Sequence, residues 1–67
     1  MTTKRLGAVV KRFREARQLT QQQLAKKARI SQAYLSRLEA GEKKNPGIQV
    51  AQRLAKALGV GVEELVR

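Results

Sequence analysis

The sequence predicts an all-α fold. Its 67 residues are enough for one domain with one core, so we treat residues 1–67 as one unit and exclude a second domain. No cysteine is available for a disulfide, and so small a core then depends on efficient helix packing. The composition fits helices, because 42% of the residues are hydrophobic, nine of these are Ala, and Pro occurs once. Apolar residues also recur at helical spacing.

The first helix is expected over residues 3 to 17. Thr2 or Thr3 can supply its N-cap oxygen. Its apolar face consists of Leu6, Val9, Val10, Phe13 and Ala16. Its other sides carry the cations Lys4, Arg5, Lys11 and Arg12. The helix is therefore amphipathic and basic, a pattern that a membrane-surface helix shares.

Two short helices are expected next, over residues 21 to 28 and 32 to 39. Thr20 and Gln23 form a capping box at the start of the first one. Ser31 is the N-cap of the second, and a left-handed Gly41 can close it. The expected inward residues are Leu24, Ala25, Ala28, Leu35 and Leu38. The expected outer face of the second helix consists of Gln32, Ala33, Ser36 and Arg37.

A fourth helix is expected over residues 48 to 58. It follows a polar loop at residues 42 to 45, and Pro46 prevents the preceding helix from continuing. Its apolar face consists of Ile48, Ala51, Leu54, Ala55 and Leu58. Gly59 ends it, and residues 62 to 66 add a last turn or two.

The formal net charge of +10 points to a polyanionic partner, either nucleic acid or an anionic membrane. Residues 4 to 44 hold twelve Lys or Arg against three Glu, whereas residues 45 to 67 hold three against two. The hydrophobic content is too high for a disordered basic tail, and no apolar run approaches the ~20 residues of a membrane span. The start of the chain lacks the apolar segment of a signal peptide, so we expect a cytosolic protein.

The composition argues against catalysis. Cys, His and Asp are absent, which excludes a thiolate nucleophile and the usual zinc and two-metal ligand sets. The remaining Glu, Lys, Ser and Tyr residues do not form a nucleophile, base and metal set at their spacings. We therefore expect no enzyme, no metal and no cofactor. Without a ligand-binding domain, no small-molecule ligand is expected either.

Two helices of about eight residues joined by a short turn have the geometry of a helix-turn-helix unit. The string LTQQQLAKKARISQAYLSRLEAGEKKNP, residues 19–46, resembles the phage repressor and Cro-like (Xre) family of DNA-binding domains, and AKALGV at residues 55–60 extends the likeness. The positions that match the family pattern are Gln21, Leu24, Ala25, Ile30, Ser31, Leu35, Glu39, Gly41, Pro46 and Leu58. The resemblance implies a compact five-helix, lambda-repressor-like bundle whose third helix enters the DNA major groove.

The resemblance also implies roles on DNA. Gln32 is expected to read a base, because its amide can donate and accept at adenine. Arg37 is expected at guanine or a phosphate, and Ala33 at a thymine methyl. Gln21 matches the family's phosphate-binding Gln, placed to brace Gln32. The other expected phosphate contacts are Tyr34, Ser36, Lys43, Lys44 and Asn45.

Arg14 and Glu39 match a pair that forms a partly buried salt bridge between the first and third helices of relatives. Three other positions depart from the family pattern. Arg29 replaces the usual Gly of the turn, at a cost of about 1 kcal/mol if φ is positive there. Gly47 and Gly61 replace the usual Ser caps of the last two helices, at a cost of roughly a few tenths of a kcal/mol each.

The function expected from these features is that of a transcriptional regulator that binds double-stranded DNA sequence-specifically, most simply a small repressor on a palindromic operator. We expect a weak homodimer, because the sequence ends at Arg67, soon after the region that relatives use to dimerise. The residues assigned to the dimer interface are Leu58, Val60, Val62, Leu65 and Val66. The alternative is a protein-interaction module of the same fold, such as an antitoxin or a transcription bridging factor. A membrane-active peptide fits poorly, because several helices are capped and share one apolar core.

Overall fold

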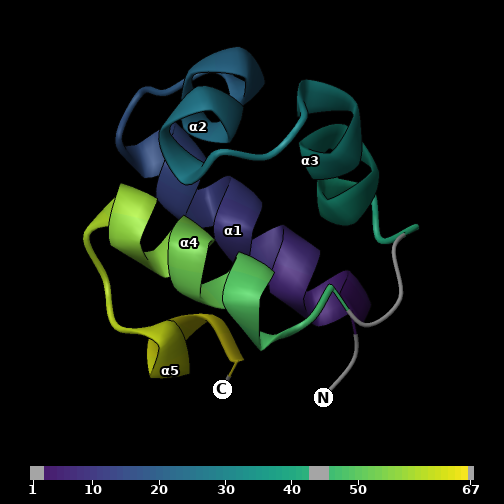
Figure 1. The fold of residues 1–67 in the computed structure, drawn as a ribbon, viewed down its shortest axis with the longest axis vertical. Helices are drawn as coiled ribbons and strands as arrows, with labels where there is room; N and C mark the ends of the chain where they lie inside the picture. Colours follow the sequence, from purple (N-terminus) through teal and green to yellow (C-terminus); the bar gives the residue numbers. More distant parts are fainter. Residues whose placement is uncertain (1–2, 43–45, 67) are drawn as a thin grey trace.

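The structure is a computed structural model that describes residues 3–42 and 46–66. The described residues form helices and no strand (Figure 1). The helices are α1 (Thr3–Ala16), α2 (Gln21–Ala28), α3 (Gln32–Glu39), α4 (Ile48–Leu58) and α5 (Val62–Val66). The all-α prediction is confirmed, and the predicted bounds hold except that α1 ends at Ala16. Thr2 lies outside the described residues, and Thr3 already belongs to α1.

The helices bury one shared apolar core. α1 packs against α3, α4 and α5, while α2 packs against both α3 and α4 (Figure 1). The buried cluster consists of Leu6, Val10, Leu24, Ala25, Ala28, Leu35, Leu38, Leu54, Ala55, Leu58 and Leu65. Across residues 3–42 and 46–66, no helix is long and apolar enough to cross a membrane.

Two residues of the predicted apolar stripes lie outside the core. Ile48 is 59% exposed, and Ala16 is exposed as well. Each is the terminal residue of its helix and stands toward the edge of its stripe, where no neighbouring helix covers it. Both residues lie on the predicted apolar faces, but neither is part of the core.

α1 and α3 approach each other closely at Gly7, a buried residue that sequence reasoning did not single out. A Cβ at Gly7 would overlap the backbone carbonyl oxygen of Leu38 and lie 3.1 Å from the Cα of Glu39. Backbone atoms cannot turn aside as the end of a long side chain can. Glycine at this position therefore sets how closely α3 sits on α1.

Four helices end in the same way, with a left-handed residue after the last turn. These residues are Gln18, Arg29, Gly41 and Gly59, with φ of 57°, 59°, 80° and 74°. The amide that follows each of them donates to a carbonyl five residues back: Leu19 to Arg14, Ile30 to Ala25, Glu42 to Arg37 and Val60 to Ala55. This is the Schellman closure, which satisfies carbonyl groups that a helix end leaves unpaired. Arg29 adopts the positive φ that was expected of it, whereas Gln18 was not anticipated.

The two glycine caps also lie where the sequence placed them. Gly47 precedes α4 with φ of 88° and offers no side-chain cap. The amide of Gly61 donates to the Glu64 carboxylate at 2.9 Å, so the start of α5 is partly capped from within the helix.

Candidate nucleic-acid interface

α3 presents an exposed polar face to solvent. Leu35 and Leu38 are fully buried and fix the rotation of α3 about its axis. The residues left exposed on the outer face are Gln32, Ala33, Ser36 and Arg37, as predicted. The face therefore carries an amide, a methyl, a hydroxyl and a guanidinium, groups that recognise base edges and phosphates.

The start of α3 is held by a side-chain cap. The backbone N–H of Tyr34 donates to the hydroxyl of Ser31 at 3.0 Å. Tyr34 is half-buried and packs against the core, whereas Ser36 is exposed. Tyr34 therefore contributes to packing, and its phosphate contact, like that of Ser36, stays a prediction.

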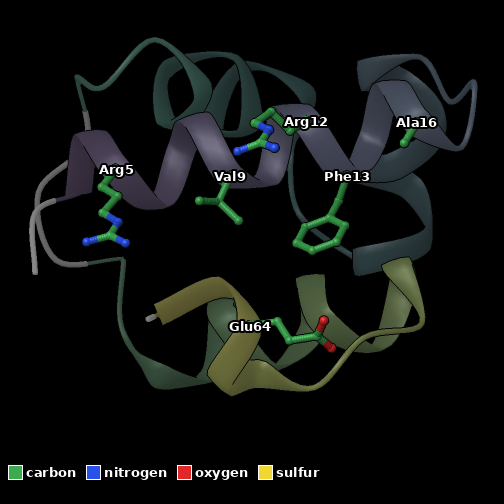
Figure 2. A pocket seen from close by; sticks show the side chains of 6 residues that line it. All are labelled: Arg5, Val9, Arg12, Phe13, Ala16 and Glu64. Atoms are coloured by element: carbon green, nitrogen blue, oxygen red, sulfur yellow. The ribbon is translucent and has the colours of Figure 1, made fainter.

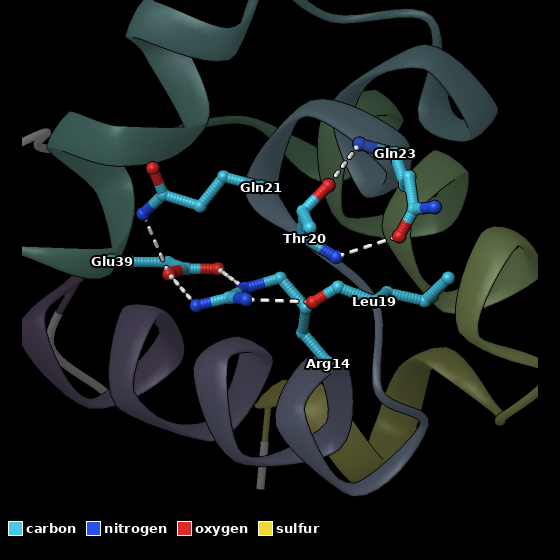
Figure 3. Close-up of polar contacts among 6 residues, drawn as sticks. All are labelled: Arg14, Leu19, Thr20, Gln21, Gln23 and Glu39. Carbon is cyan, nitrogen blue, oxygen red and sulfur yellow. Dashed lines mark hydrogen bonds and ion pairs between the residues drawn. The ribbon is translucent and has the colours of Figure 1, made fainter.

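A capping box fixes the start of α2. The N–H of Gln23 donates to the Thr20 hydroxyl at 3.0 Å, and the N–H of Thr20 donates to the Gln23 side chain at 2.9 Å (Figure 3). Gln21 follows as the first residue of the helix, with its side chain available for a tertiary contact.

A hydrogen-bond network joins α1, α2 and α3 (Figure 3). Arg14 donates through Nε to Glu39 Oε2 at 2.8 Å and through Nη2 to Oε1 at 3.1 Å. Its Nη1 donates to the carbonyl of Leu19 at 2.7 Å. Gln21 Nε2 donates to Glu39 Oε1 at 2.9 Å. The Glu39 and Arg14 side chains are only 3% and 12% exposed, so this ion pair lies largely out of water.

The network keeps Arg14 charged. The hydrogen bond to Glu39 raises the pKa of the Arg14 guanidinium above its ordinary value; burial opposes this, and the negative charge of Glu39 adds to it. The two-pronged geometry is the strong form of an arginine–carboxylate pair. The pair predicted from the resemblance is thus present, and it clamps the end of α3 to α1.

Gln21 was expected to brace Gln32, but its side chain makes a different contact. Its amide donates to Glu39, near the opposite end of α3, because a shielded carboxylate is a stronger acceptor than an exposed neutral amide. The structure therefore positions Gln21 relative to α3 through Glu39. Lys43, Lys44 and Asn45 lie outside the described residues, so their predicted phosphate contacts stay predictions.

Two residues assigned to a dimer interface are in the core. Leu58 and Leu65 are 2% and 0% exposed, so the prediction that they contact a second copy was wrong. They are covered because α5 folds back against α4 and α1. Val60 and Val62 pack against the core and remain half-buried, and the Val66 side chain lies outside the described part.

A groove between α1 and α5, which sequence reasoning missed, has a volume of about 420 Å³. Its lining residues are Arg5, Val9, Arg12, Phe13, Ala16 and Glu64 (Figure 2). Val9 and Phe13 point from α1 toward α5 and are half-buried, because the short α5 covers only part of α1. Both were assigned to the core stripe, and their partial exposure depends on where α5 ends.

The chain matches the family model described as Helix-turn-helix over residues 10–65. It is 41% identical over 63 residues to the uncharacterised HTH-type transcriptional regulator y4dJ of Sinorhizobium fredii. This match covers 94% of this chain and 80% of that protein. It is 39% identical over 61 residues to the immunity repressor protein of Bacillus phage phi105. That match covers 91% of this chain and 42% of the repressor, so this chain spans less than half of the repressor's length.

The fold is similar to that of SinR, an HTH-type transcriptional regulator of Bacillus subtilis and a master regulator for biofilm formation. The structure of SinR in complex with DNA superposes with a TM-score of 0.88 at 31% identity, over 92% of this chain and 98% of that chain. SinR in its complex with the SinI protein gives a TM-score of 0.87 at 31% identity, over 91% of this chain and 59% of that chain.

Proposed function

The chain belongs to the Helix-turn-helix family of DNA-binding transcriptional regulators, and we propose that it acts as a dimer on a palindromic operator in double-stranded DNA. Repression is the mode that the likeness to a phage immunity repressor supports. The relatives are transcriptional regulators, and we infer no catalytic activity for this chain. We place its action in the cytosol, as expected from the sequence.

The observation that carries this proposal is the exposed face of α3 on a rigidly held helix. Leu35 and Leu38 anchor α3 in the core, and Glu39 ties its last turn to Arg14. A helix that enters a groove must keep its rotation and tilt, because a small shift misplaces every base contact. The net charge of +10 supports the same partner.

Within this proposal, residues of α3 contact the DNA bases, and residues on and around α3 contact the DNA phosphates. Gln32, Ala33 and Arg37 contact base edges in the major groove. The proposed phosphate contacts are Gln21, Tyr34, Ser36, Lys43, Lys44 and Asn45. Gln21 uses one amide hydrogen on Glu39, which leaves its second amide hydrogen for a phosphate oxygen.

We place the dimer contact at the α1–α5 groove rather than at the buried leucines. The groove carries apolar Val9 and Phe13 between a cation, Arg12, and an anion, Glu64. We place Arg12 of one copy opposite Glu64 of the other, and a two-fold contact then forms this pair twice. The apolar part is small, which fits a dimer that forms fully only on DNA.

The operator proposal is tested by selecting bound sequences from random duplex DNA. The protein is then footprinted on the most enriched sequence. We expect a palindrome with half-sites centred about 34 Å apart and two chains bound per site. One protected half-site with one bound chain would defeat the dimer and leave DNA binding standing. No enriched sequence would favour the protein-interaction alternative.

The dimer surface is tested by charge exchange. Arg12→Glu and Glu64→Arg should each weaken operator binding, and the double variant should recover most of it, because the exchanged pair is again opposite in sign. Glu64→Arg also removes the hydrogen bond that caps α5, so thermal melting of each variant checks that α5 stays folded. Lys11→Glu, exposed on α1 outside the groove, matches the charge change of Arg12→Glu and controls for general attraction to DNA. If the double variant binds the operator as weakly as the single variants, the dimer contact does not lie at this groove.

A further inference from the structure

A second basic surface lies between α2 and α4. It is a groove of about 530 Å³ lined by Lys27, Ala28, Arg29, Arg53, Lys56 and Ala57. None of these residues belongs to α3. In Figure 1 the end of α4 that leads to α5 lies at the left of the molecule, and α3 lies at the right. The groove is therefore separate from the proposed DNA-reading face.

The groove combines a cationic rim with a small apolar floor. Lys27, Arg29, Arg53 and Lys56 are exposed, whereas Ala28 is buried and Ala57 half-buried. No carboxylate lines the groove, and no ion pair is formed by these four cations among the described residues. Four unpaired like charges around one hollow attract an anion of matching spacing.

Arg29 stands on this rim in an unfavourable conformation. Its φ of 59° is less favourable for a residue with a Cβ than for glycine. The same closure at the end of α4 uses Gly59, so the fold itself does not require a charged residue there.

The hollow continues along α4. Gln49 and Gln52 line a shallow extension of about 270 Å³ together with Arg53 and Lys56. Their amides can donate to and accept from a peptide backbone. The surface thus suits an elongated occupant rather than a single small anion.

We propose that this groove binds an acidic polypeptide segment of a partner protein. Its carboxylates meet the rim cations, and a small apolar side chain rests on Ala57, which is half-buried. A second DNA duplex fits less well, because a duplex is a convex rod whose phosphates carry no apolar group for the floor. The groove shares no residue with α3, so the segment and DNA bind at the same time. This inference is independent of the proposed operator.

The test uses a fluorescent peptide of alternating Glu and Ala, with anisotropy measured with and without a saturating short duplex. The double variant Arg53→Ala/Lys56→Ala should weaken peptide binding about five- to tenfold. Arg29→Gly should weaken it as well, and its fold is secure because glycine relieves the strain at that position. The matched control is Lys11→Ala/Lys26→Ala, which removes two exposed cations outside the groove and should change binding less than about twofold.

Three results would overturn the proposal. An equal loss in the Lys11→Ala/Lys26→Ala control would mean general attraction to a basic protein. Displacement of the peptide by the duplex would mean that the peptide and the DNA compete for the same surface of the protein. A larger loss of duplex affinity in Arg53→Ala/Lys56→Ala than in the control would assign the groove to DNA. Amide shifts in NMR spectra should centre on Ala57 and its neighbours Arg53 and Lys56 when the peptide binds.

Discussion

Gln18 and Arg29 close α1 and α2 with the same hydrogen bonds that Gly41 and Gly59 provide after α3 and α4. A side chain at positive φ crowds its own backbone, whereas glycine does not. The turn between α2 and α3 keeps the geometry of the motif even though Arg stands at the position where glycine is usual. The closing hydrogen bonds therefore outweigh the preference of this one residue.

We expect Arg29→Gly to raise the free energy of unfolding by about 0.5 to 1 kcal/mol, because relief of strain exceeds the extra freedom of glycine in the unfolded chain. Thermal melting measures the change. Lys26→Gly, within α2, is the control and should lower stability by about 1 kcal/mol. A melting temperature of Arg29→Gly that is unchanged or lower would contradict the proposed strain.

Substitutions of base-reading residues and of phosphate-binding residues should affect DNA binding in different ways. Gln32→Ala should cost about 1 to 3 kcal/mol per half-site on the operator and leave random DNA almost unaffected, because only base edges carry sequence. Lys43→Ala should weaken operator and random DNA together. Titrations of each variant on both duplexes measure this. A uniform loss for Gln32→Ala would make Gln32 a phosphate contact.

At the scale of elements, two features fix the position of α3 on α1: a close approach of the two helices and an ion pair between them. Gly7 lets α1 come near α3, and Arg14 binds Glu39 at the end of α3. The first sets the distance between the two helices and the second holds them in register. Both act on the helix that carries the proposed base contacts, so variants here should alter stability and DNA recognition together.

Gly7→Ala should lower the free energy of unfolding by about 1 to 3 kcal/mol, although alanine favours a helix intrinsically. The added methyl meets the backbone of α3, which cannot rotate away. Gly61→Ala is the matched control, since the nearest atoms to its methyl belong to the flexible carboxylate of Glu63. Urea unfolding compares the two. Greater stability in Gly7→Ala would show that α1 and α3 can separate freely.

Glu39→Gln should lower the free energy of unfolding by about 1.5 to 3 kcal/mol, because the Arg14 guanidinium keeps its charge and loses its charged acceptor. Glu15→Gln removes an exposed carboxylate from α1 and should stay within about 0.5 kcal/mol. Urea unfolding of both variants measures the difference. Equal effects would mean that the ion pair contributes no more than a surface charge.

At the scale of the whole molecule, three sides of the bundle carry different surfaces. The outer face of α3 is polar and basic, the α1–α5 groove is apolar with charges of both signs, and the α2–α4 groove is basic. The molecule measures only 25 × 23 × 19 Å, so these surfaces lie close together without sharing residues. Its charge is concentrated in residues 4 to 44, which include all of α3.

The salt dependence of DNA binding should be steep. Each phosphate neutralised adds about 0.9 to the slope of log affinity against log salt, so a dimer with six to ten such contacts gives a slope of about −5 to −9. Titrations of operator duplex at several salt concentrations measure it. An affinity almost independent of salt would remove the proposed DNA partner.

The sequence alone determined where α2, α3 and α4 begin and end, whereas α1 ends one residue earlier than predicted. The signals are local: Thr20 and Ser31 as caps, and Gly41 and Gly59 as left-handed terminators, act within one or two turns of the chain. The exposed face of α3 also followed from helical periodicity. The Arg14–Glu39 pair followed from the family resemblance, because spacing does not indicate a contact across 25 positions.

Only the tertiary structure decided which apolar and polar groups meet. Periodicity marks a stripe but not how far a neighbouring helix covers it, so Ile48 came out exposed, Leu65 came out buried and Phe13 half-buried. The hydrogen bond from Gln21 to Glu39 depends on how α2 packs against α3, which the sequence pattern of neither helix contains. Contacts between distant segments arise from the lengths and crossings of whole helices, and no local pattern contains them.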